Sequence, residues 1–157
     1  MYRYVFSLSL SLWLACWAVA FAVLLAATAA IAAPETGPQG DWLTANRGGV
    51  VEIESCGAAL CGRIVGIDRA PAEPMPTDVH GQSQCGLTII SGEKPDGPGT
   101  WLGEITDPRD GNSYQAKLWV DGRGNLRLRA FIGVPALGAT QVWHRFAGHL
   151  DAACRFA

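Results

Sequence analysis

The sequence predicts a mainly β protein: one small antiparallel barrel or sandwich of about eight strands, preceded by an export signal. Three observations support this prediction. Residues 5–33 form an apolar run without a charge. All 19 glycines and 9 prolines follow that run, and no long 3.6-residue apolar period accompanies them. Period-two alternation of apolar and polar residues recurs instead, which is typical of strands with one buried face.

The amino-terminal run has the three parts of a signal peptide. Arg3 gives a charged start, the apolar run follows, and Ala30-Ile31-Ala32 forms a cleavage site of small residues. We expect cleavage near Ala32 and a periplasmic or secreted mature protein. The alternative is an uncleaved membrane anchor, because the run is longer than most secretory signals.

The expected organisation is a signal peptide at 1–32, a short linker at 33–39, a barrel domain at 40–146 and a tail at 147–157. A mature chain of about 125 residues is the size of one domain and can bury a core. Without Arg3 it carries 11 basic and 14 acidic side chains and no basic run. This balance gives no electrostatic footprint for nucleic acid.

The expected strands are short and closely spaced, which favours a closed barrel or a sandwich. They cover 42–45, 50–55, 63–67, 87–91, 101–106, 114–120, 126–132 and 140–146. The clearest pair is the hairpin around 121–125. There Tyr114, Ala116, Leu118 and Val120 share one face of the first strand, and the glycine-rich turn tolerates a positive φ. Residues 68–84 form a proline-containing loop, and the tail is read as coil or a short helix.

Four cysteines remain after the signal, an even number that suggests two disulfides in an exported chain. Cys56 and Cys61 flank a short loop between two strands, so they can pair across a hairpin. Cys85 would then pair with Cys154. Four cysteines allow three possible disulfide connectivities. The alternative to two disulfides is that Cys61 or Cys85 is a buried free thiol.

Tryptophans suggest two further features. Trp42 opens the first strand and Arg145 ends the last, so in an up-and-down barrel the guanidinium can stack on the indole and close the floor. The alternative is an ordinary core tryptophan and a solvated arginine. Trp101, Tyr114, Leu118 and Trp143 are candidates for lining an apolar ligand pocket, and the alternative is that they fill the core.

Catalytic and metal-binding patterns are weak. No serine lies in a G-x-S-x-G frame, and the three histidines lack a nucleophile motif, so we expect no enzyme. Asp107, Asp110 and Asn112 could hold calcium, but their spacing fits an ordinary turn better than an EF-hand. His144 and His149 lack zinc-ligand spacing. We therefore expect no metal and no cofactor.

Four motifs in order resemble a family of small exported bacterial proteins catalogued as a domain of unknown function. They are Gly40-x-Trp42-x-Thr44, Cys61-Gly62-x-Ile64-Val65, Trp101-x-Gly103-x-Ile105-x-Asp107-Pro108-x-x-Gly111-x-x-Tyr114-x-Ala116 and Gly138-x-Thr140-Gln141-x-Trp143-x-Arg145. The resemblance implies a lipocalin-like barrel without an established activity or cofactor. It also implies that Trp42 and Arg145 form the barrel floor. The chain departs from the family pattern between Asp78 and Leu87.

The favoured function is a periplasmic barrel that binds a small, largely apolar molecule. The alternative is a cell-envelope interaction or scaffolding module with a filled core. A hydrolase that uses His80 or His144 is a third hypothesis. No nucleic acid partner is expected, and membrane contact is expected only through an uncleaved leader.

Overall fold

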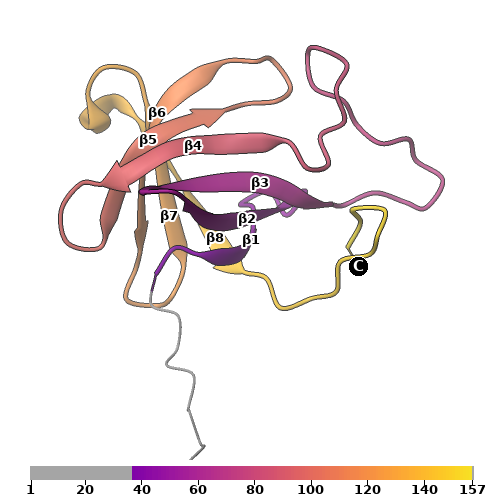
Figure 1. Cartoon of the computed structure of the whole chain (residues 1–157), viewed down its shortest axis with the longest axis horizontal. Helices are drawn as coiled ribbons and strands as arrows, with labels where there is room; N and C mark the ends of the chain where they lie inside the picture. Colours follow the sequence, from indigo (N-terminus) through magenta and orange to yellow (C-terminus); the bar gives the residue numbers. More distant parts are fainter. Residues whose placement is uncertain (1–36, 157) are drawn as a thin grey trace, which may run out of the picture. The chain divides into compact units, whose positions relative to one another are not determined.

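The computed structural model describes residues 37–156. The predicted signal peptide and the first residues of the linker lie outside this part of the chain. Within it, eight antiparallel strands form a closed barrel in which each strand pairs with its sequence neighbours and β1 pairs with β8 (Figure 1). The prediction of an all-antiparallel barrel is confirmed. The strands are β1 (Gly40–Leu43), β2 (Gly49–Cys56), β3 (Ala59–Ile67), β4 (Thr88–Pro95), β5 (Thr100–Thr106), β6 (Ser113–Val120), β7 (Leu126–Phe131) and β8 (Ala139–Arg145).

The meander gives the barrel two different ends. The β1–β2, β3–β4, β5–β6 and β7–β8 connections lie at one end, called here the open end. The β2–β3, β4–β5 and β6–β7 turns lie at the other, the closed end, together with the start of β1 and the end of β8. The β7–β8 connection contains a short 3₁₀ helix, Pro135–Leu137, which the sequence pattern did not predict.

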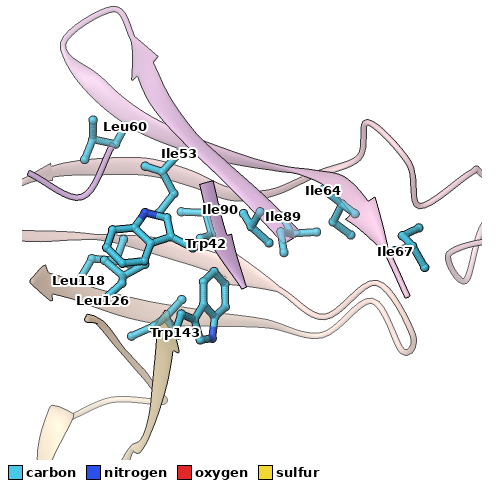
Figure 2. Close-up of a cluster of buried hydrophobic side chains, with 12 residues drawn as sticks. Trp42, Ile53, Leu60, Ile64, Ile67, Ile89, Ile90, Leu118, Leu126 and Trp143 are labelled. Carbon is cyan, nitrogen blue, oxygen red and sulfur yellow. The ribbon is translucent and has the colours of Figure 1, made fainter. Parts of the chain in front are cut away.

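Apolar side chains from every strand form a core inside the barrel. Trp42 and Trp143 are the largest of the fully or almost fully buried side chains, and they lie near Leu118 and Leu126 (Figure 2). Ile64 and Ile67 lie further along β3 toward the open end. Burial of each such side chain stabilises the fold by about 1.5–3 kcal/mol.

The tail 146–156 is coil with isolated bridges, and it runs back along the outside of the barrel. It starts against β1, where the Phe146 N–H donates to the Asp41 carbonyl, and it reaches the end of β3, where the Ile67 N–H donates to the Cys154 carbonyl. Gly66 leaves room for this crossing, because a Cβ there would lie 2.6 Å from Leu150 Cδ2 and 3.0 Å from Phe156 Cδ1. Val50 pairs with Gly66 and is fully buried, so the tail covers an apolar strip on the outer face of the sheet.

Both predicted disulfide pairings are present. Cys56 and Cys61 close the β2–β3 hairpin with their Cα atoms 5.9 Å apart. Cys85, in the β3–β4 connection, is joined to Cys154 with a Cα separation of 6.0 Å. The second bridge therefore fixes both the long loop and the tail at the open end.

Candidate functional site: a cavity at the open end

A cavity of about 530 Å³ lies at the open end of the barrel. It is bounded by the β1–β2 turn, the β5–β6 turn, Gln84 of the β3–β4 connection and the adjoining strands. Pockets of roughly 300–1,000 Å³ are typical of sites for small organic ligands. The core is thus filled in the closed half and hollow in the open half.

The part of the cavity wall that the strand interiors supply is mostly branched aliphatic. Period-two geometry explains this, since the inward face of each strand carries every second residue. The apolar lining residues on the strands are Val51, Ile64, Ile67, Ile89, Ile105 and Ala130, and Ala45 and Pro108 add apolar groups from the turns. Such a wall contacts a hydrocarbon chain favourably and offers it no hydrogen bond.

The polar lining groups come mainly from turns and strand ends. Thr44 and Asn46 belong to the β1–β2 turn, where the Thr44 hydroxyl donates to Asn46 Oδ1 at 2.8 Å. Gln84 uses its amide nitrogen on the Thr77 carbonyl at 3.0 Å. These three side chains therefore use hydrogen-bonding groups to stabilise the loops, and those groups are not available to a ligand.

Two polar lining residues retain free donors. Gln141 Oε1 accepts from the indole N–H of Trp143 at 2.8 Å. Because an indole nitrogen can only donate, this bond fixes which end of the Gln141 amide is oxygen. Among residues 37–156, neither the Gln141 amide nitrogen nor the Tyr114 hydroxyl has a hydrogen-bond partner in the protein.

Asp107 and Arg109 are the charged residues of the lining. Arg109 donates from Nε to Oδ1 of Asp107 at 3.0 Å and from Nη2 to Oδ2 at 2.6 Å. The Arg109 backbone N–H adds a third bond to Oδ1. The side-chain hydrogen bond from Arg109 is the main reason that the pKa of Asp107 is lowered. The carboxylate therefore stays ionised at neutral pH, and the two charges cancel.

The closed end contains the contact expected between the first and last strands. Trp42 and Arg145 are register partners of β1 and β8, and Arg145 Cζ lies 4.0 Å from the centroid of the Trp42 ring. The indole N–H donates to the Pro38 carbonyl at 2.6 Å. Arg145 also donates to the carbonyls of Gln39 and Gly37. The amino-terminal segment is therefore tied across the floor of the barrel.

Comparison with known proteins supports the same architecture. Residues 40–145 match a family described as "uncharacterized protein conserved in bacteria (DUF2147)". The chain belongs to this family. The match begins at the first residue of β1 and ends at Arg145, so it covers the whole barrel. No curated protein matches the sequence.

A solved structure has a similar fold. It is protein HP1028 from Helicobacter pylori, which its title assigns to the lipocalin family. The TM-score is 0.60 at 16% sequence identity, over 69% of this chain and 82% of that chain. At this identity the similarity shows the fold alone, which is an eight-stranded lipocalin-like barrel.

The structure places the four predicted ligand-lining residues at different depths in the barrel. Of the four residues, only Tyr114 lines the cavity. Leu118 and Trp143 are buried in the closed half of the core, and Trp101 packs against that core at the start of β5. The alternation of apolar and polar residues predicted which side chains point into the barrel. It did not predict how far along the barrel axis each of them lies. Tyr114 and Leu118 share one face of β6, yet four residues correspond to about 13 Å along a strand.

Glu93 is a feature that the sequence did not reveal. It is fully buried on β4, and neither carboxyl oxygen has a hydrogen-bond partner among the described residues. Burial raises its pKa to about 8. Its strand partner is Leu60, a core residue of β3. The carboxyl group is therefore held mainly protonated at neutral pH.

A bulge explains why the pattern failed at Glu93. The register of β4 shifts between Ser91 and Lys94, and Gly92 has a φ of 66°. Strict alternation from Ile90 would place Gly92 inward and Glu93 outward. One extra residue in the strand reverses that assignment.

The turn considered for calcium has another explanation. The carboxylate of Asp107 accepts a hydrogen bond from the Arg109 guanidinium. Asp110 Oδ1 accepts from the Asn112 backbone N–H at 2.9 Å, which closes a local turn. Across residues 37–156, no three His, Cys, Asp or Glu side chains are grouped as metal ligands. His144 is exposed, and its Nδ1 lies 2.9 Å from Asn125 Oδ1. In the same part of the chain, no helix has the length and apolar character needed to span a bilayer.

Proposed function

We propose that this chain is an exported binding protein that holds a small, largely apolar molecule in the open half of its barrel. The observation that carries the proposal is the cavity of about 530 Å³ with an aliphatic wall. A hollow of this kind is open to a ligand, whereas the closed half is already packed with side chains. The lipocalin-like fold is consistent with this use.

Export to the periplasm is part of the proposal. It is supported by the uncharged apolar run at 5–33, by the Ala30-Ile31-Ala32 cleavage pattern and by two disulfides, which persist in oxidising compartments. The test is the mass of protein recovered from the periplasm of the expressing cell. A mature chain that starts at Ala33 with four oxidised cysteines supports export, and an intact leader with free thiols contradicts it.

Binding is tested by filling the cavity. Ala130 lines it from β7, so Ala130→Trp places an indole inside the hollow. Ala58, exposed in the β2–β3 turn at the closed end, provides the control Ala58→Trp. Displacement of an environment-sensitive fluorescent probe by amphiphiles should be saturable in the native protein and in the control, and lost in Ala130→Trp. Equal binding by all three proteins would reject the cavity as the site.

A second candidate function is a protein-interaction module of the cell envelope. The observation that favours it is the β7–β8 connection, where Ile132, Val134 and Leu137 are 74%, 53% and 82% exposed. Arg129 holds this loop through the carbonyls of Pro135 and Ala136, so the apolar side chains project from a fixed support. Exposed apolar groups of this kind occur at protein interfaces.

This candidate predicts that Ile132→Ser with Leu137→Ser abolishes crosslinking to an envelope protein. The same double variant should leave probe binding in the cavity unchanged. An unchanged crosslinking pattern would reject the loop as an interface.

A further inference from the structure

We propose that the cavity selects neutral amphiphiles, namely acyl or alkyl chains that end in a hydroxyl, ester or amide group, over free fatty acids and alkylamines of the same length. The inference rests on the proposed binding function and specifies its ligand class. It depends on how polar groups are distributed over the lining, and on which of those groups are already engaged.

The cavity has an apolar inner part and a polar mouth. Its aliphatic residues lie on the inward faces of the strands, and most of its polar residues lie on turns at the mouth or next to them. A ligand with one apolar and one polar end therefore fits with the chain inside and the polar end at the mouth. An entirely apolar ligand would leave the hydroxyl of the half-buried Tyr114 without a partner where it displaces water, which has a cost, whereas the exposed Gln141 amide keeps access to water.

The charges at the mouth are already neutralised. Arg109 binds both oxygens of Asp107, in the bidentate geometry that is among the strongest for such pairs. A carboxylate ligand that recruited Arg109 would have to remove it from Asp107 and leave a negative charge beside its own. An ammonium ligand would have to compete with Arg109 for the same carboxylate. Within the described lining, no other charged side chain is present to receive either ion.

The free hydrogen-bonding groups of the lining suit a neutral head group. The Gln141 amide nitrogen is a donor whose orientation is fixed by Trp143, and the Tyr114 hydroxyl can donate or accept. A carbonyl oxygen or a hydroxyl can use these groups without bringing a net charge. Monododecanoylglycerol, dodecanoate and dodecylammonium provide a matched set of probes that differ mainly at the polar end.

The experiment compares the three probes by calorimetry at neutral pH, below their aggregation concentrations, with the full mature protein. Monododecanoylglycerol should bind up to about fivefold more tightly than either ion, the ratio expected when a solvent-exposed ion pair must be displaced. Gln141→Ala should weaken the neutral probe and leave the weak binding of the ions nearly unchanged.

Two variants test the role of the ion pair. Asp107→Asn keeps an oxygen for the backbone N–H of Arg109 but removes the carboxylate that the guanidinium binds, which leaves only the charge of Asp110 nearby, so dodecanoate should become the preferred ligand. Arg109→Gln removes the cation and should favour dodecylammonium. Because Arg109 is exposed, this change should leave thermal stability close to that of the native protein.

The outcomes separate this inference from the proposal beneath it. If dodecanoate binds the native protein as tightly as monododecanoylglycerol, or if neither variant changes the ranking, the inference is wrong and the binding function stands. If none of the three probes binds, the cavity proposal fails and this inference fails with it.

Discussion

Arg145 lies over the ring of Trp42, with 4.0 Å between Cζ and the ring centroid, and it joins the last strand of the barrel to the first. The same guanidinium donates to the carbonyls of Gln39 and Gly37. Its planar fork thus serves a stacked contact and several hydrogen bonds together. Lysine cannot reproduce this arrangement, because its ammonium group is a compact point charge.

Arg145→Lys should therefore lower the free energy of unfolding by about 1–2 kcal/mol, through loss of the stacked contact and of at least one hydrogen bond. Denaturant unfolding of the mature protein measures this. Arg123→Lys in the exposed β6–β7 turn is the control and should change stability by less than about 0.5 kcal/mol. Equal effects of the two substitutions would show that the contact does not hold the barrel closed.

Glu93 predicts an unusual pH dependence of stability. Its pKa is about 8 in the folded protein, compared with an ordinary value of 4.5, because burial disfavours the ionised form. The folded state therefore binds its proton more tightly than the unfolded state does. The contribution of Glu93 is most favourable below pH 4.5 and is progressively lost as pH rises from 4.5 through 8, with a slope approaching about 1.4 kcal/mol per pH unit.

Glu93→Gln should remove this slope and make the protein more stable than the native form above pH 8. The measurement is the free energy of unfolding between pH 5 and pH 9. Glu104→Gln, at an exposed position of β5, should keep the native pH profile. Parallel pH profiles for the native protein and Glu93→Gln would contradict a buried, protonated carboxyl group.

The two disulfides should contribute unequally. Cys85 and Cys154 are 69 residues apart, whereas Cys56 and Cys61 are 5 apart. In the chain-entropy account, the long loop restricts the unfolded chain more, by about 4 kcal/mol compared with about 2 kcal/mol for the short one. Paired serine variants compared by thermal unfolding test this. A larger loss from the Cys56–Cys61 variant would indicate that hairpin geometry dominates over loop length.

Gly103 should tolerate no side chain. A Cβ at this position would lie 2.6 Å from the Glu93 backbone nitrogen and 2.7 Å from the Ser91 carbonyl oxygen, and these backbone atoms belong to the β4 bulge. Gly103→Ala should destabilise the barrel by about 1–3 kcal/mol. Gly122→Ala is the matched control, since its Cβ would meet no atom within 4 Å. Similar unfolding midpoints for the two variants would disprove the close packing of β4 on β5.

The sequence predicted all eight strands because alternation and turn residues are local signals. It underestimated the extent of β3 and β4, whose ends depend on pairing with a neighbour rather than on their own pattern. β4 continues through Gly92 to Pro95, residues that read as a turn when taken alone. Glu93 was missed for the same reason, because its burial follows from a bulge in the register.

The site was less predictable than the fold. Trp42 and Arg145 could be paired because closure of a meander brings the first and last strands together. The cavity wall depends on how far each inward residue lies from the open end, and one sequence does not give the stagger between strands. The most informative sequence signal was the position of Tyr114, two residues after the Asp107–Asn112 turn, which places it at the mouth of the cavity.

The most direct measurement of the central claim is a chemical-shift titration of the labelled mature protein with monododecanoylglycerol. Saturable shifts concentrated at Ile105, Tyr114, Ala130 and Gln141, and absent from Leu118 and Leu126 in the closed half, are the predicted result. No saturable shift at the cavity residues, or shifts confined to the exposed loop 132–137, would contradict a hollow, ligand-binding open end.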